Sequence, residues 1–286
     1  MDPVSWTKRP ELDRPALIAA FRGWNDGGEA ASTAVAYLRD RWEAEPMADI
    51  DPDGFLDFQM ARPTVRLEAG VTRRIEWPEY RFSLARVDGR DAVLFLGAEP
   101  NVRWRAFIET FTATAREIGV AEVFTVGAFL ADVPHTLPTP VTGLAVDEER
   151  SRQLGLTSSR YEGPTGIVGV LHDAMSRGGF AASSLWAAVP HYLPGGPNPK
   201  AAGALVGTIT ALTGLRASTD TLDRAAEAWE AQVTSTISEN AELAAYVRQL
   251  EQVAADREGP AEIPSGEALA AELERFLRDQ RPQDQG

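Results

Sequence analysis

The sequence contains no cysteine, only three histidines and, among its 28 cationic residues, only two lysines, Lys8 and Lys200. Without cysteine the chain forms no disulfide and has no thiolate nucleophile, iron–sulfur cluster or cysteine-bound zinc. Basic residues are also outnumbered by acidic ones, which gives a net charge of −14. This balance argues against a nucleic-acid partner, because phosphate backbones are bound by lysine and arginine.

Long apolar runs are absent as well. No stretch of 18 consecutive apolar residues occurs, and the first ten residues lack the apolar core of a secretion signal. We therefore expect a cytoplasmic protein without a membrane partner. At 286 residues, 44% of them hydrophobic, the chain is long enough to bury a large core.

Short apolar runs of strand length alternate with segments of helical period over the first three quarters of the chain. This alternation predicts an α/β fold with a largely parallel sheet flanked by helices, over residues 1–218. The expected strands are 16–21, 91–97, 122–130 and 184–190, and the expected helices are 29–44, 103–118, 166–177 and 199–214.

A β-rich insertion and a helical extension complete the predicted organisation. Strands are expected at 55–58, 64–67, 72–77 and 81–84, with a hairpin turn at Ala69-Gly70, so the sheet should be mixed. From residue 219, apolar positions between Leu222 and Ala254 recur at spacings of four and three. A break at 258–264 and a second helix from Ser265 predict a helical hairpin over 219–282 that packs on its own sheet, with an oligomer-forming coil as the alternative.

If the four buried strands are parallel, the loops after them share the edge at which open α/β sheets bind ligands. We predict a binding surface there. Its candidate residues are Gly23, Trp24, Asn25, Asp26, Gly27, Asp132, Pro134, His135, Thr136, Tyr161, Glu162, Gly163, Pro164, His191, Tyr192, Asn198 and Lys200.

The first of these loops, Gly23–Gly28, reads GWNDGG and precedes a predicted helix. Its glycines could present backbone N–H groups to an anion, but the motif is neither G-x-G-x-x-G nor a P-loop. Asp26 would repel a phosphate and is better explained as a cap of the following helix. We favour a tight structural corner over a binding surface, and a phosphate site least. Trp24 is either an interface anchor or half-buried packing.

The remaining polar candidates have structural and functional interpretations. His135 and His191, with Asp132, could serve general acid–base chemistry or satisfy local hydrogen bonds. Lys200 could bind an anion or be a solvated residue at a helix start, and Thr165 could cap the helix at 166. Because no serine lies on a G-x-S-x-G elbow and no histidines are paired at i and i+4, we predict no catalytic residue, no metal and no cofactor.

Four segments in order resemble the proteasome assembly chaperone 2 family in its actinobacterial branch. They are the strand–GWNDGG–helix unit at 16–38, the segment from Gly127 to Thr136, the segment YEGPTG at 161–166, and PHY at 190–192 with PNPK at 197–200. The resemblance covers roughly residues 15–215. It implies a purine-nucleoside-phosphorylase-like fold, usually without proven catalysis, with relatives that assist proteasome assembly, and a homo-oligomer, for which we expect a trimer.

Some of those relatives dock through a C-terminal hydrophobic-Tyr-any tail, which the sequence Asp284-Gln285-Gly286 does not match. Two hypotheses follow. The first is a non-enzymatic protein-interaction or assembly-chaperone-like protein, whose partners are its own copies and proteasome subunits or other proteins. The alternative is a protein or enzyme that binds a nucleoside or another small molecule at the same edge.

Overall fold

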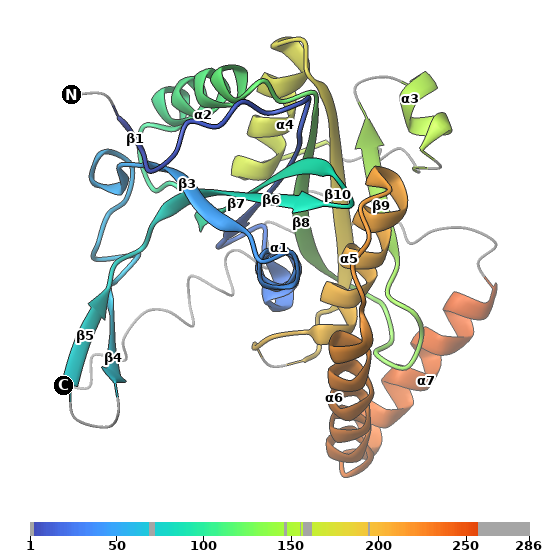
Figure 1. The fold of residues 1–286 in the computed structure, drawn as a ribbon. Coiled ribbons are helices and arrows are strands. Elements are labelled where there is room, and N and C mark those ends of the chain that lie inside the picture. The colour runs from blue at the N-terminus through green and yellow to red at the C-terminus, as the bar shows by residue number, and fades with distance from the viewer. Residues whose placement is uncertain are drawn as a thin grey trace.

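The computed structural model describes residues 3–68, 72–145, 148–154, 156, 162–193 and 195–256. Their main feature is an eight-stranded sheet with the order β1-β3-β6-β7-β2-β8-β10-β9 (Figure 1). The four central strands, which are parallel, are β7 (Arg90–Ala98), β2 (Ala16–Arg22), β8 (Glu122–Ala131) and β10 (Ala181–Pro190). The antiparallel additions are β6 (Tyr80–Val87), β3 (Glu45–Ile50) and β1 (Val4–Trp6) on one side, and β9 (Val141–Ala145) on the other.

Helices cover both faces of this sheet, and the alternation of side chains along β2 shows why its strands are apolar throughout. Leu17, Ala19 and Phe21 pack in a core with α2 (Trp104–Ile118) and α4 (Ile167–Arg177). Ile18 and Ala20 point to the opposite core, which contains α1 (Ala30–Arg41) and α5 (Pro199–Thr213). Because successive side chains of a strand face opposite sides, a strand covered on both faces must be apolar at every position.

The four parallel strands and the four helices that flank them are confirmed, with ends within a few residues of those expected. Three strands of the main sheet were not foreseen: the edge strands β1 and β9, and β3 beside β1. β3 reads EPMADI, and its charged and proline residues hide it from a search for apolar runs. The strand expected at 55–58 is wrong. Phe55 follows the short 3-10 helix η2 (Pro52–Gly54) and is buried against Tyr80 and Phe107 in a turn.

Two strands of the insertion leave the main sheet. β4 (Thr64–Glu68) and β5 (Thr72–Glu76) pair with each other in a separate two-stranded sheet, which projects from the body (Figure 1). The turn expected at Ala69-Gly70 lies outside the described residues. A short 3-10 helix, η1 (Gly27–Glu29), precedes α1, and α3 (Glu148–Gln153) follows β9.

The helical extension folds differently from the prediction. It forms α6 (Asp220–Ser238) and α7 (Ala241–Asp256), so the helix expected up to Ala254 is interrupted at Glu239-Asn240, whereas the break expected at 258–264 lies outside the described residues. Asn240 lies between the helices, where its Oδ1 accepts the backbone N–H groups of Glu242 and Leu243, both at 3.1 Å. This amide caps α7, as asparagine does at helix starts. The second helix expected from Ser265 lies outside the described residues. Among the described helices, none has the length and apolar character of a bilayer span.

Candidate functional site

The four loops after the parallel strands meet at one edge of the sheet, as expected. The Gly23–Gly28 loop folds back over β8, where the carbonyl oxygen of Asn25 accepts the N–H of Ala128 at 2.8 Å. The same loop touches the chain after β10, since the carbonyl oxygen of Gly28 accepts the N–H of Asn198 at 2.7 Å. Asn198 in turn caps α5 through its Oδ1, which accepts the N–H of Ala201. Segments about 170 residues apart in sequence are thus fixed to each other.

The Gly23–Gly28 loop is a structural corner. Asp26 is 7% exposed, and its Oδ1 accepts the N–H of Ser32 at 3.0 Å in the first turn of α1, which confirms the capping role. Burial raises the pKa of this carboxyl above its ordinary value, and the hydrogen bonds to Ser32 oppose that change. Gly28 has a φ of +56° and packs against Asn198 and Val189, so a side chain there would be both strained and crowded. Trp24 is half-buried.

The N-terminus of α4 is capped from two other loops. Oε1 of Glu99, in the loop after β7, accepts the N–H of Ile167 at 2.9 Å, and its Oε2 accepts the N–H of Trp24 at 3.3 Å. Oδ1 of Asn25 accepts the N–H of Val168 at 3.3 Å. The expectation that Thr165 caps this helix is wrong. The residue at the N-cap position is Gly166, and the first N–H groups of the helix are accepted by Glu99 and Asn25, which are distant in sequence.

These contacts explain why residue 166 is a glycine. A Cβ atom on Gly166 would lie 2.6 Å from Cγ of Asn25, so only glycine leaves room for that amide. Burial raises the pKa of Glu99, while the two N–H groups favour its charged form. The double role of Glu99, which caps α4 and bridges to Trp24, has no local sequence signal.

His135, after β8, is buried with 2% exposure. The Tyr192 hydroxyl accepts the backbone N–H of His135 at 2.8 Å and lies 2.8 Å from its Nδ1, while Nε2 lies 3.0 Å from Oγ1 of Thr234 on α6. Both ring nitrogens therefore have a hydrogen-bond partner, one in the loop after β10 and one on α6. Burial lowers the pKa of His135 and raises that of Tyr192 to about 12. The histidine is thus held neutral as a structural link.

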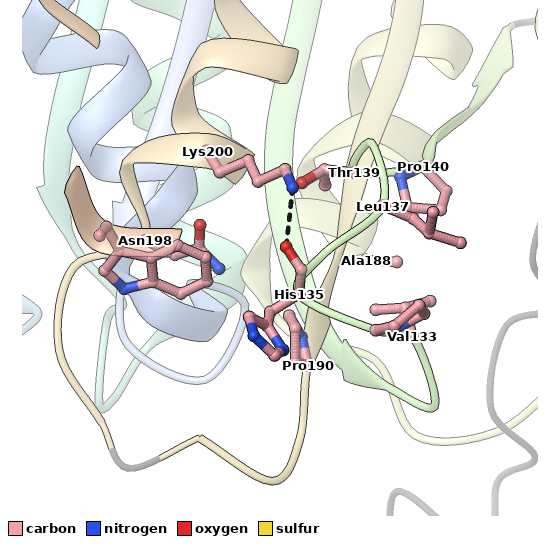
Figure 2. A pocket seen from close by; sticks show the side chains of 11 residues that line it. Val133, His135, Leu137, Thr139, Pro140, Ala188, Pro190, Asn198 and Lys200 are labelled. Carbon is pink, nitrogen blue, oxygen red and sulfur yellow. Dashed lines mark hydrogen bonds between the residues drawn. The ribbon is translucent and has the colours of Figure 1, made fainter. Parts of the chain in front are cut away.

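Lys200 ties the same turn to α6. Its ammonium donates to the carbonyl oxygen of His135 at 2.7 Å (Figure 2). The same ammonium forms an ion pair with Glu230. Only 18% of the lysine side chain is exposed. Lys200 lies at the start of α5, as one interpretation of the sequence expected, but its charge is paired with a carboxylate of the chain and is not freely solvated.

α7 contacts further residues of the β8 and β10 loops. Oγ1 of Thr136 donates to Glu251 at 2.5 Å, and the Tyr246 hydroxyl donates to Asp132 at 3.2 Å. Asp132 also lies 3.1 Å from Nδ1 of His191. The helix residues in these contacts were not predicted as site residues, because their partners lie about 30 to 115 residues away and no local pattern marks them.

A small cavity lies at this edge among the described residues. The cavity between the β8 loop and Lys200, with Val133 and Ala188 on its walls, has a volume of about 10 Å³ (Figure 2). That volume accommodates at most one water molecule.

The predicted surface therefore splits into covered and open parts. Asn25, Asp26, Pro134, His135 and Asn198 are buried, and all of them except the proline are hydrogen-bonded internally. Gly23, Trp24 and Glu162–Pro164 remain partly or fully exposed beside the region covered by α6 and α7, and we call them the open rim. Tyr161 lies outside the described residues. Asp132 and His191 are exposed at the border with α7.

Comparison with known proteins gives a family match. The model of the PAC2 family matches residues 20–237. A Streptomyces avermitilis PAC2 family protein of known structure is 47% identical and superimposes with a TM-score of 0.75, over 82% of this chain and 99% of the other. A Mycobacterium tuberculosis proteasome-assembly chaperone homologue, Rv2125, is 46% identical with a TM-score of 0.74, over 81% of this chain and 99% of that one.

The same fold occurs in archaea. PbaB of Pyrococcus furiosus, an archaeal proteasome activator, superimposes with a TM-score of 0.66 at 16% identity, over 82% of this chain and 97% of its own. At that identity the likeness concerns the fold alone. A search of curated proteins found no match.

Proposed function

The chain belongs to the PAC2 family, and we propose that it acts in the cytoplasm as a non-enzymatic, chaperone-like protein that binds other proteins. The family match spans most of the chain, and a relative with 46% sequence identity is a proteasome-assembly chaperone homologue. The partner we propose is a proteasome subunit of the same organism.

The observation that carries this proposal is the internal use of the polar groups at the loop edge. The carboxylates, amides and cation that would bind a small substrate instead cap helices or pair with α6 and α7. The cavity that remains beside Lys200 has room for one water molecule and not for a nucleoside, which occupies a pocket of several hundred Å³. The polar groups of this edge thus support a rigid surface and are not arranged to hold a small molecule.

The open rim is the surface we assign to the partner. Trp24 is half-buried beside the exposed Gly23 in a corner whose backbone is fixed by hydrogen bonds, and Glu162–Pro164 are exposed next to it. Both segments are immobilised by Glu99, which bonds Trp24 and the helix that follows 162–166. A rigid platform with a partly exposed tryptophan binds with little loss of conformational entropy.

The test is recovery of a partner from the native cells. Full-length tagged protein is crosslinked mildly, purified and examined by mass spectrometry, beside the variants Trp24→Ala and Glu162→Lys and the control Glu109→Lys, which changes an exposed residue on α2. We expect proteasome subunits to be recovered with wild type and control, and to be reduced about tenfold by the rim variants.

A thermal-shift screen with nucleosides, nucleotides and phosphate separates this function from the alternative. A ligand at about 100 times its Kd would stabilise the protein by about 2.7 kcal/mol. A clear shift with one of these compounds, together with no retained protein, would replace the proposal with a small-molecule function.

A further inference from the structure

Glu99, in the loop after β7, joins the two segments of the open rim. Its Oε2 accepts the backbone N–H of Trp24, and its Oε1 accepts the N–H of Ile167, directly after the 162–166 segment. The backbone N–H of Glu99 donates to the carbonyl oxygen of Arg22 at 2.7 Å, so the backbone at this position is fixed as well. One side chain thus sets how two segments that are distant in sequence lie relative to each other.

The Gly23–Gly28 loop leaves room for this carboxylate. A Cβ atom on Gly23 would lie 3.0 Å from Cβ of Glu99 and 3.3 Å from its Oε2, and Gly23 has a φ of +137°. A side chain at position 23 would therefore be strained and would crowd the carboxylate. Glycine at this position keeps the carboxylate within reach of Trp24.

The two hydrogen bonds need the ionised form of Glu99. An ionised carboxylate only accepts hydrogen bonds, and here each of its oxygens faces one N–H group. A proton on either oxygen would place an O–H group opposite an N–H group, and one bond would be lost. The bond to Trp24 is the longer one, at 3.3 Å against 2.9 Å for Ile167, so we expect it to be lost first.

Burial and hydrogen bonding act on this carboxyl in opposite directions. Burial raises the pKa of Glu99, whereas the N–H groups of Ile167 and Trp24 lower it, and burial is the larger effect. The N-terminus of α4, at which the carboxylate lies, also favours the negative charge through the helix dipole. The charge that the rim requires is therefore held against the effect of burial.

The elements around Glu99 carry other titratable or charged side chains. They are Arg22 and Asp26 in and before the Gly23–Gly28 loop, Tyr80 on β6, Arg103 and Arg105 at the start of α2, and Glu162 before α4. Burial first, and the charge of Glu99 second, raise the pKa of Tyr80. Asp26 bonds Ser32, and Arg103 lies over the Phe55 ring. No cation among the described residues pairs with Glu99, so the two N–H groups hold its charge.

We propose that the ionised carboxylate of Glu99 is the positioning group of the open rim: it holds Trp24 and the 162–166 segment in the arrangement that the partner binds, and loss of its charge releases them. This inference rests on the proposed function, which assigns the rim to a protein partner. A fixed tryptophan loses less conformational entropy on binding than a mobile one, so the affinity for the partner depends on the charge of Glu99. Glu99 acts through these segments and not by contact with the partner.

Backbone amide signals test this role without a partner. The N–H resonances of Trp24 and Ile167 are followed by NMR in the full chain from about pH 8 to about pH 5, a range that stays above the sequence pI of about 4.7, where solubility is lowest. Both resonances are expected to shift together as Glu99 takes up a proton, with a midpoint above the ordinary pKa of glutamate. Wild-type resonances that do not move over this range would overturn the proposal.

Glu99→Gln assigns the shift to its carboxyl. The amide does not titrate, and its single oxygen cannot replace both acceptors, so the common shift should vanish. The control for this assignment is built into the loop, because burial also raises the pKa of Asp26. A shift that persists in Glu99→Gln therefore belongs to Asp26 and overturns the proposal.

Partner recovery tests the consequence for binding. At about pH 7.5, Glu99→Gln should retain about tenfold less partner than wild type, because a hydrogen bond that fixes the rim is lost. The difference should narrow toward about pH 5, since wild type loses the same charge, whereas titration of the partner affects both proteins alike. Glu109→Gln, which removes an exposed carboxylate on α2, is the matched control and should behave as wild type throughout. A difference that stays constant with pH would show a role independent of charge and would overturn the proposal.

The two measurements separate this inference from the proposed function. If wild type retains its partner but the resonances of Trp24 and Ile167 do not titrate, the inference fails and the proposed function stands. If the resonances titrate with Glu99 but wild type retains no protein, the proposed function fails, and the ordering of the rim by Glu99 is established independently.

Discussion

Replacing Gly166 with alanine would place a methyl group where the Asn25 side chain lies, and the consequence can be worked out from the structure. The backbone at Gly166 has φ −90° and ψ −172°, which alanine adopts without strain, so the cost is steric. The new Cβ would lie 2.6 Å from Cγ of Asn25. Overpacking of this kind costs about 1–3 kcal/mol. Displacement of the amide also breaks its hydrogen bond to the N–H of Val168, about 1 kcal/mol.

One further term, from the unfolded chain, sets the net effect. Alanine restricts the unfolded chain more than glycine does, which returns about 0.4–1 kcal/mol. The expected loss in the free energy of unfolding for Gly166→Ala is therefore about 2 kcal/mol. Asn25→Ala alone removes the hydrogen bond to Val168 and leaves a small void, so it should lower the free energy of unfolding by about 1–2 kcal/mol. In the double variant the methyl group introduced at position 166 occupies that void without a clash, so the loss should be about 1 kcal/mol and not the sum of the two.

Equilibrium denaturation in urea measures all four proteins. The double-mutant cycle should give a coupling energy of about 2 kcal/mol that favours the double variant. Asn101→Ala is a suitable control, because Oδ1 of this amide accepts the backbone N–H of Asp57 and does not contact Gly166. If Gly166→Ala is as stable as wild type, or if the two changes add to within about 0.5 kcal/mol, the steric argument for this glycine is wrong.

Two other predictions concern the contacts between the β8 loop and α6. Lys200→Met keeps the aliphatic stem but removes the charge that joins His135 to Glu230. The free energy of unfolding should therefore fall by about 1–2 kcal/mol, and amide hydrogen exchange in α6 should accelerate. Unchanged exchange in α6 would show that the ion pair does not hold the helix. Burial lowers the pKa of His135, so below about pH 6.5 the unfolded chain binds more protons than the folded one, and stability is lost on acidification. The Tm advantage of wild type over His135→Gln should therefore shrink between about pH 7.5 and about pH 5.5, and an advantage that stays constant would contradict this assignment.

Local pattern determined the elements of the central fold. The strands of the parallel centre are short apolar runs because both of their faces are buried, and that requirement is visible in the sequence itself. The parallel order then places the following loops on one edge, so the meeting of the Gly23–Gly28 loop with Asn198 could be expected from the alternation of strands and helices. Asp26 as a cap was predictable from local sequence too, since its partner is six residues away.

Tertiary structure alone decided what the edge does with its polar groups. Glu99 bonds a helix 68 residues further along, and Lys200 meets Glu230 across two helices. Such partners depend on tertiary packing and leave no periodic pattern in the sequence. A partly buried, paired lysine therefore cannot be told from a solvated one. The turn at Asn240 was hidden because spacings of four and three continue through the break between α6 and α7. Hydrophobic period records which side of an element is covered, whereas the partner that covers it is fixed only when the chain folds.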